Sequence, residues 1–183
     1  IEADTTSDLG AVRAAIDAAN HPALLVADVV ASLAAAPFAM DTLGVNVAVG
    51  ASQKALMCPP GLGFVSISER ARARAAESTM PRFYWDWARA IAQAENDNTP
   101  FTPAVSTIVA LDEALQLLLR EGLEHAFARH VALGRACRAA VKAMGLELYS
   151  PDSDRAAILT AVLTPEGIDA VALRLALRDR HGI

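Results

Sequence analysis

The sequence is poor in lysine and in cysteine. Lys54 and Lys142 are the two lysines among 183 residues, arginine supplies the other positive charges, and the formal net charge is −5. That balance argues against a nucleic-acid partner held by phosphate neutralisation. Cys58 and Cys137 lie far apart without a CxxC pattern, which indicates reduced thiols and argues against a disulfide framework or a zinc site. The four histidines have no ligand spacing, so no metal site is expected.

Long apolar runs and targeting signals are also lacking. No uninterrupted apolar stretch approaches about 20 residues, so we expect no membrane span. The first ten residues have neither a basic region nor an apolar run, so they do not form a signal peptide. These absences, with the unpaired cysteines, predict a cytoplasmic protein.

Hydrophobic residues make up 54% of the chain, enough to bury a substantial core. Helical spacing of apolar residues predicts helices over 8–19, where Asp8 is the expected N-cap, and 68–79. Short apolar runs predict strands over 21–30, 45–50 and 62–68, the first of a kind found in parallel sheets. Residues 40–44 resemble a short helical turn. Strands separated by helices or longer crossovers predict a layered α/β sheet with helices on its faces.

The second half of the chain has a different texture. Four aromatics gather in residues 81–87, where we expect them to cover the edge of a core, and residues 95–103 have the composition of a loop. Two long helices are predicted over 104–122 and 123–145, each ended by a glycine. Strands over 146–150 and 156–165 and a helix over 168–180 then predict a smaller α+β domain. We therefore expect one domain at residues 1–121 and a second at 122–183.

The stretch GASQKALMCPPGLGF, residues 50–64, places Lys54 on a short loop between two predicted strands. A neutral lysine amine is a nucleophile that forms an imine with an aldehyde, and desolvation favours the neutral form. The apolar neighbours Ala51 and Leu56 meet that requirement. A structural lysine whose amine reaches the surface is the alternative.

Asp28 interrupts the apolar run LLVADVV. A buried carboxylate is costly unless it has a donor or a cation beside it, and the end of a strand is where ligands of open α/β sheets gather. An aspartate that merely caps the next turn is the alternative. An aspartate facing a pyridine nitrogen, with a lysine at the aldehyde of the same ring, is the pairing with which proteins tune pyridoxal phosphate.

Residues 24–71 resemble the core of the class V, fold-type I pyridoxal-phosphate aminotransferases, in particular the alanine–glyoxylate and serine–glyoxylate group. The shared motifs are D-x-V-x-S-L-x-x-x-P, S-Q-K-A-L and P-P-G, in this order, and the resemblance continues over 100–115 and 121–150. It implies part of the three-layer α/β sandwich of the large domain, followed by part of the small α+β domain.

The resemblance implies roles for four residues near the ring. Lys54 matches the lysine that holds the cofactor as an internal aldimine and later moves the α-proton, and Asp28 matches the partner of the pyridinium nitrogen. Val30, two residues further and so expected on the same side of the strand, matches the residue that packs on the ring face. Gln53 matches a donor to the cofactor phosphate.

Two threonines complete the implied site. Thr102 in the PFTP segment matches a threonine that reaches the phosphate of the neighbouring subunit, which implies a homodimer with shared active sites. Thr5 matches a hydroxyl residue near the phenolic oxygen of the ring. By composition alone, Thr102 is an ordinary loop threonine and Thr5 an N-terminal one.

The implied reaction moves an amino group from a small amino acid, such as alanine or serine, to a 2-oxo acid such as glyoxylate or pyruvate. Three alternatives stay open: a pyridoxamine–pyruvate aminotransferase, a pyridoxal-phosphate-dependent lyase or desulfurase of the same fold, and a non-catalytic fragment that dimerises. An absorbance band with pyridoxal phosphate that borohydride fixes onto Lys54 separates enzyme from fragment.

The sequence also departs from the family pattern. The Gly/Ser-rich phosphate loop, the aromatic that stacks on the cofactor and the arginine that binds the substrate carboxylate have no counterpart, and a few residues after Ser7 are missing. Either segments of a longer enzyme are absent from this sequence, or it is a genuine fragment. For a fragment, we expect weak cofactor binding and negligible turnover, because the imine lacks its anchors.

Overall fold

A computed structural model describes residues 6–150 and 156–183. Thr5 lies outside the described residues. Residues 8–127 form one compact unit, and the described residues from 128 onward, with residues 6–7, form another. The division between these units lies inside a long helix, a few residues after the domain boundary expected from the sequence, which remains a prediction.

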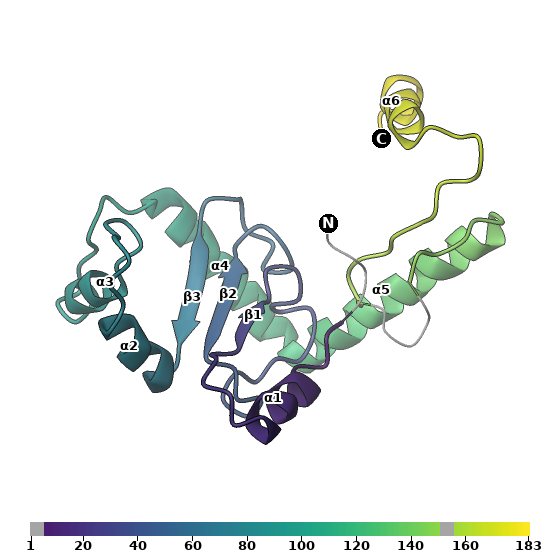
Figure 1. Cartoon of the computed structure of the whole chain (residues 1–183). Coiled ribbons are helices and arrows are strands. Elements are labelled where there is room, and N and C mark those ends of the chain that lie inside the picture. The colour runs from purple at the N-terminus through teal and green to yellow at the C-terminus, as the bar shows by residue number, and fades with distance from the viewer. Residues whose placement is uncertain (1–5, 151–155) are drawn as a thin grey trace. The chain divides into compact units, whose positions relative to one another are not determined.

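A three-stranded sheet forms the centre of the first unit (Figure 1). Its strands are β1 (Val26–Asp28), β2 (Val47–Ala51) and β3 (Gly63–Ile67), with β2 in the middle. Strand β1 runs parallel to β2, whereas β3 runs antiparallel to it. All three strands were expected, but β1 is much shorter than the apolar run over 21–30, and the chain turns directly after Asp28.

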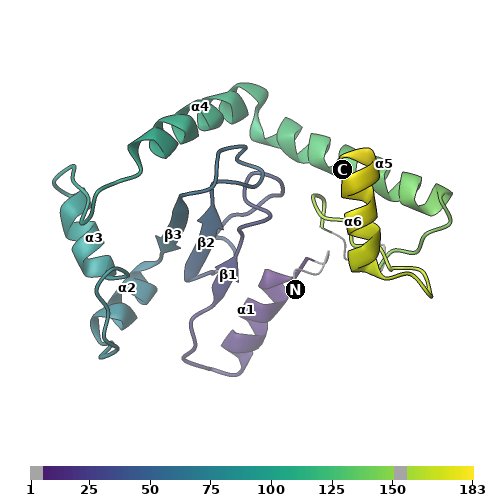
Figure 2. The same cartoon turned by 90° about the horizontal axis from the view of Figure 1, so that it is seen from above.

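One face of this sheet carries the core. Leu25, Ala27, Val29, Val45 and Ala48 form a buried cluster, and helix α1 (Leu9–Ala18) packs against it. The predicted N-cap is confirmed, since a carboxylate oxygen of Asp8 accepts a hydrogen bond from Ala11 N at 2.9 Å. Figure 2 shows α1 on one side of the sheet and helix α4 (Val105–Glu121) on the other.

The other face of the sheet, on the side of α4, is partly open to solvent (Figure 2), although Val47 on this face is buried. Val26 on β1 is 58% exposed and Val65 on β3 is 47% exposed. Strand register places both side chains on the face that also carries Asp28, because side chains alternate between faces along a strand. The sheet therefore offers an accessible surface beside the carboxyl end of β1.

Two short helices follow β3. Helix α2 (Glu69–Ala76) lies within the helix predicted over 68–79 and has Ser68 as its N-cap, and α3 (Trp87–Ala94) has Asp86 as its N-cap. Helix α3 was not anticipated. The expectation that the aromatics of residues 81–87 cover a core edge was wrong, because Phe83, Tyr84 and Trp85 are each more than 60% exposed. The expected loop over 95–103 is confirmed.

The second unit contains most of helix α5 (Leu123–Ala143) and helix α6 (Ala170–His181), which begins at the N-cap Asp169. The two strands expected over 146–150 and 156–165 are not formed among the described residues. A single antiparallel bridge joins Leu148 to Val162. None of the helices in the described part of the chain is long and apolar enough to cross a membrane.

Candidate active site at the carboxyl ends of strands β1 and β2

The parallel register of β1 and β2 directs Asp28 and Lys54 to the same edge of the sheet. Asp28 ends β1 opposite Val49 of β2. Strand β2 continues to Ala51, and the loop that follows carries Lys54. Because the carboxyl ends of parallel neighbours meet at one edge, this is where an open α/β sheet offers a ligand site.

Asp28 is held by a local turn and is exposed. One of its carboxylate oxygens accepts a hydrogen bond from Val30 N at 2.9 Å. The sequence predicted a buried acid, and this was wrong: its apolar neighbours Ala27 and Val29 are buried, whereas Asp28 lies on the open face. The turn-capping interpretation holds, and it leaves the second carboxylate oxygen available for a ligand.

The expectation that Asp28 and Val30 lie on the same side of one strand was wrong. Strand β1 ends at Asp28, and the amides of Ser32 and Leu33 both donate to Val29 O, at 3.1 and 2.8 Å. Val30 is therefore part of a turn and is half-buried. It remains close in sequence to Asp28, but strand geometry no longer places the two side chains on one side.

The lysine loop, residues 52–62, is organised by Ser52, which is fully buried. Its hydroxyl donates to Pro59 O at 2.7 Å and accepts from Leu62 N at 3.3 Å, so one side chain joins both ends of the loop. Two backbone bonds add to this closure, from Ser52 N to Leu62 O and from Cys58 N to Ser52 O. The loop therefore has one defined shape.

Lys54 lies on the outer side of this loop and is exposed, as is Gln53. The expectation of a dry lysine was wrong for the chain by itself. Its neighbours Ala55 and Leu56 are the residues that turn inward and become buried. These two apolar side chains therefore anchor the loop to the core and do not cover the Lys54 amine.

Thr102 and the end of the lysine loop line the same groove. This hollow of about 520 Å³ is bordered by Gly61 and Gly63, by Val65 of β3 and by Thr102. The thiol of Cys58, which is buried, donates to Thr107 O at 3.7 Å and so ties the lysine loop to the first turns of α4. Thr102 is exposed and lies shortly before that helix, separated from it by Pro103 and the N-cap Ala104.

Two features escaped the sequence reasoning. Ser52 looked like one small polar residue among several, although its place between a strand end and the lysine is where a loop needs closing. Arg89 was not singled out from the sequence, although its spacing from the aromatics on both sides could have indicated a cluster. Within residues 6–150 and 156–183, no group of three or more His, Cys, Asp or Glu side chains is arranged to hold a metal.

An acid and an amine at one open edge can hold a flat ligand by its two ends. A carboxylate suits a protonated ring nitrogen, and a primary amine suits an electrophilic carbon such as an aldehyde. The amide of Gln53 and the hydroxyl of Thr102 are donors of the kind that bind an anionic group.

Comparison with known proteins places these features in a family. The family described as aminotransferase class-V matches residues 7–183. A serine–glyoxylate aminotransferase of Methylorubrum extorquens is 42% identical over 175 residues, which cover 92% of this chain and 43% of that protein. The chain thus spans less than half the length of this relative.

Solved structures agree with the sequence match. An alanine–glyoxylate aminotransferase from Nostoc sp. superposes with a TM-score of 0.89 at 27% identity, covering 98% of this chain and 48% of its own. A pyridoxamine–pyruvate aminotransferase from Mesorhizobium loti has a TM-score of 0.85 at 36% identity, covering 98% of this chain and 46% of its own.

Proposed function

Because the chain belongs to the class-V aminotransferase family, we propose that it is the part of a pyridoxal-phosphate-dependent aminotransferase that carries the reactive lysine. The observation that supports this most is the parallel pairing of β1 with β2, which brings Asp28 and the Lys54 loop to one edge of the sheet. Asp28 ends β1 and Lys54 lies in the loop that follows β2, so a ligand at this edge can meet both groups.

The donor set at this edge suits pyridoxal phosphate. The Asp28 carboxylate matches the ring nitrogen, the Lys54 amine matches the aldehyde, and the Gln53 amide matches the phosphate. All three residues are exposed, so a ligand can reach them. Val30 is the proposed contact for the ring face. Thr5 is proposed, by family resemblance alone, to lie near the phenolic oxygen.

Each residue then has a defined task. When bound, the cofactor supplies an aldehyde and a ring that accepts electrons. Lys54 would hold the cofactor through that aldehyde, and its amine, when free, would carry the α-proton of the amino-acid substrate. Asp28 keeps a proton on the ring nitrogen, because a carboxylate beside it favours the charged form. Ser52 keeps the loop closed, so that Lys54 returns to one position.

The proposed reaction transfers an amino group from a small amino acid, such as serine or alanine, to a 2-oxo acid such as glyoxylate or pyruvate. The names of the serine–glyoxylate and alanine–glyoxylate relatives support this substrate class. A second candidate is amino transfer from pyridoxamine to pyruvate, which the likeness to the pyridoxamine–pyruvate enzyme supports at 36% identity.

We also propose the finer architecture and assembly of the family for this chain. Residues 1–121 belong to a three-layer large domain and residues 122–183 to a small α+β domain. The whole protein is a cytoplasmic homodimer in which Thr102 of one subunit reaches the phosphate site of the other. Thr102 is exposed, so its hydroxyl is accessible to a second subunit, which supports this role.

A half-reaction tests the proposed function. The full-length protein is loaded with pyridoxal phosphate and mixed with serine, alanine or aspartate, and the 2-oxo acid formed is measured. We expect one equivalent per site from at least one amino acid, and none from a Lys54→Ala variant. A Lys142→Ala variant is the matched control and should react normally. Alanine and pyridoxal formed from pyruvate and pyridoxamine, with no oxo acid formed from any amino acid, would favour the second candidate, and no transfer with any donor contradicts both.

A further inference from the structure

Arg89 lies at the centre of an exposed aromatic cluster. Its guanidinium carbon lies 5.1 Å from the centroid of the Phe83 ring and 4.8 Å from that of Phe101. The same guanidinium donates to Pro100 O at 3.5 Å. Cationic groups within about 6 Å of a ring centroid are attracted by the ring's negative face. Arg89 therefore holds two segments that lie on either side of helix α3.

Phe101 receives most of these contacts. Its ring stacks on Tyr84 with centroids 4.8 Å apart and meets the edge of Phe83 at 5.5 Å. Its carbonyl oxygen accepts a hydrogen bond from the Thr99 hydroxyl at 2.7 Å. Both the side chain and the backbone of Phe101 are thus fixed, and Thr102 is the next residue along the chain.

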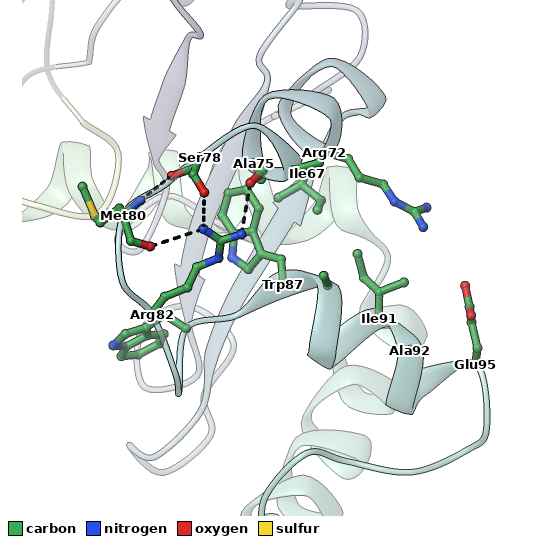
Figure 3. Close-up of a pocket in the computed structure, with 13 residues that line it drawn as sticks. Ile67, Arg72, Ala75, Ser78, Met80, Arg82, Trp87, Ile91, Ala92 and Glu95 are labelled. Atoms are coloured by element: carbon green, nitrogen blue, oxygen red, sulfur yellow. Dashed lines mark hydrogen bonds between the residues drawn. The ribbon is translucent and has the colours of Figure 1, made fainter.

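The base of this cluster is itself anchored to the first unit. Asp86, the N-cap of α3, accepts from Arg89 N at 3.2 Å. Arg82 donates to the carbonyl oxygens of Ala75, Ser78 and Met80 at 3.1 to 3.4 Å, which caps the end of α2 (Figure 3). The cavity of about 450 Å³ drawn there lies between α2 and α3. Arg82 also pairs with the Asp86 carboxylate at 4.0 Å, so the start of α3, the helix that carries Arg89, is tied to the end of α2.

We propose that Arg89 is a positioning residue that clamps Phe101 and so fixes where Thr102 lies on the groove beside the lysine loop. The inference rests on the proposed function, in which Thr102 contacts the phosphate of the cofactor in the site of the other subunit. At the other end of this segment, the hydrogen bond from the Cys58 thiol to Thr107 O holds the start of α4. Between these two points, residues 101–107 have little freedom to move.

The side chain has to be arginine for this task. A guanidinium is planar, so it can lie over two rings and still donate to a carbonyl oxygen, whereas a lysine ammonium is a compact charge that cannot do both. An Arg89→Lys variant should therefore recover part of the clamp, and Arg89→Ala none of it. Arg74→Ala is the matched control, because Arg74 is an exposed arginine on α2 whose recorded ion pair is with Glu77.

The experiment has two readouts on the full-length protein. Backbone amide order parameters of Phe101 and Thr102 report the clamp without any cofactor. We expect values near 0.85 in the wild type and below about 0.6 in Arg89→Ala, the ranges of rigid and flexible backbone. Affinities for pyridoxal phosphate and for pyridoxal report the consequence. We expect Arg89→Ala to lose about fivefold in affinity for pyridoxal phosphate and nothing for pyridoxal, which has no phosphate to position.

The two readouts separate the possible failures. Unchanged order parameters in Arg89→Ala overturn the clamp, and so does an equal loss of affinity for both compounds. A wild-type protein that binds neither compound overturns the proposed function and with it the role of Thr102, while the order parameters still decide whether Arg89 fixes the segment. Arg89→Lys values between wild type and Arg89→Ala, with Arg74→Ala unchanged, support the proposal.

Discussion

Ser52 shows how a residue without chemistry of its own determines the position of one that has it. Its buried hydroxyl joins Pro59 O and Leu62 N. Ser52→Ala leaves both groups without that partner, and an unpaired buried group costs about 1–3 kcal/mol. We expect a loss of about 2 kcal/mol in the free energy of unfolding by urea, with weaker cofactor uptake. Ser66→Ala, at an exposed strand position, is the control, and an equal loss there would contradict this role.

Asp28 combines a structural and a proposed catalytic task, and two substitutions separate them. Asp28→Asn keeps an oxygen that can accept from Val30 N but removes the charge, whereas Asp28→Ala removes both. We expect amino transfer to fall by at least about a hundredfold in both variants, the size of losing one preorganised electrostatic group.

Stability distinguishes the same two variants. Urea unfolding should leave Asp28→Asn near the wild type, and Asp28→Ala should lose about 1 kcal/mol, because it has lost the turn hydrogen bond. If Asp28→Asn keeps full activity, the carboxylate has no electrostatic role.

At the residue scale, the sequence indicated which residues to consider but not their surroundings. The motifs singled out Asp28, Lys54, Gln53 and Thr102 from residue type and order. The burial of Asp28 and Lys54 was predicted wrongly, because their apolar neighbours in the sequence were expected to enclose them. In a strand and in a tight turn, neighbouring residues point to opposite sides, so buried neighbours leave Asp28 and Lys54 exposed. Sequence alone does not tell which side is covered.

At the scale of elements, replacing a glycine with alanine should have opposite effects on stability in helices α1 and α5. Gly10 in α1 has space for a methyl group, while a methyl at Gly134 in α5 would collide with the carbonyl oxygen of Ala157. We expect Gly10→Ala to stabilise the protein by about 0.5–1 kcal/mol, since alanine is the better helix former.

Gly134→Ala should destabilise the protein by about 1–3 kcal/mol, the usual cost of overpacking. Thermal unfolding of the two variants beside the wild type measures both effects. A stabilised Gly134→Ala would show that residues 156–158 do not pack on α5.

The prediction of elements succeeded where a local signal defines them. Asp8 was recognised as a helix N-cap and Ser68 as the start of a helix, and the side chains of both accept hydrogen bonds from amides three residues away. The strands over 146–150 and 156–165 were wrong, since an apolar run does not specify a pairing partner and a single bridge at Leu148 is what forms. Helix α3 was not predicted, because the aromatic residues just before it hid the helical spacing of its apolar residues.

At the scale of the whole molecule, the family resemblance was correct, as the match over residues 7–183 confirms. The shared active site remains a proposal that mixing can test. If Thr102 acts across a dimer, Lys54→Ala and Thr102→Val subunits are each inactive or impaired, yet their heterodimer contains one intact site.

Random reassociation of the two variants should therefore restore about a quarter of the wild-type activity. The assay measures amino transfer after the variants are unfolded and refolded together. Each variant refolded alone is the control. Activity no higher than the mean of those controls contradicts a site built from two chains.

The most direct test of the account is the identity of the lysine that holds pyridoxal phosphate. The full-length protein is reduced with borohydride in the presence of the cofactor, and the modified lysine is located by peptide mass mapping. Lys142, the other lysine of this chain, is an internal reference. We predict one pyridoxyl group on Lys54, none on Lys142, and none in Lys54→Ala. Labelling of Lys142 to the same extent, or a label that persists in Lys54→Ala, would contradict the account.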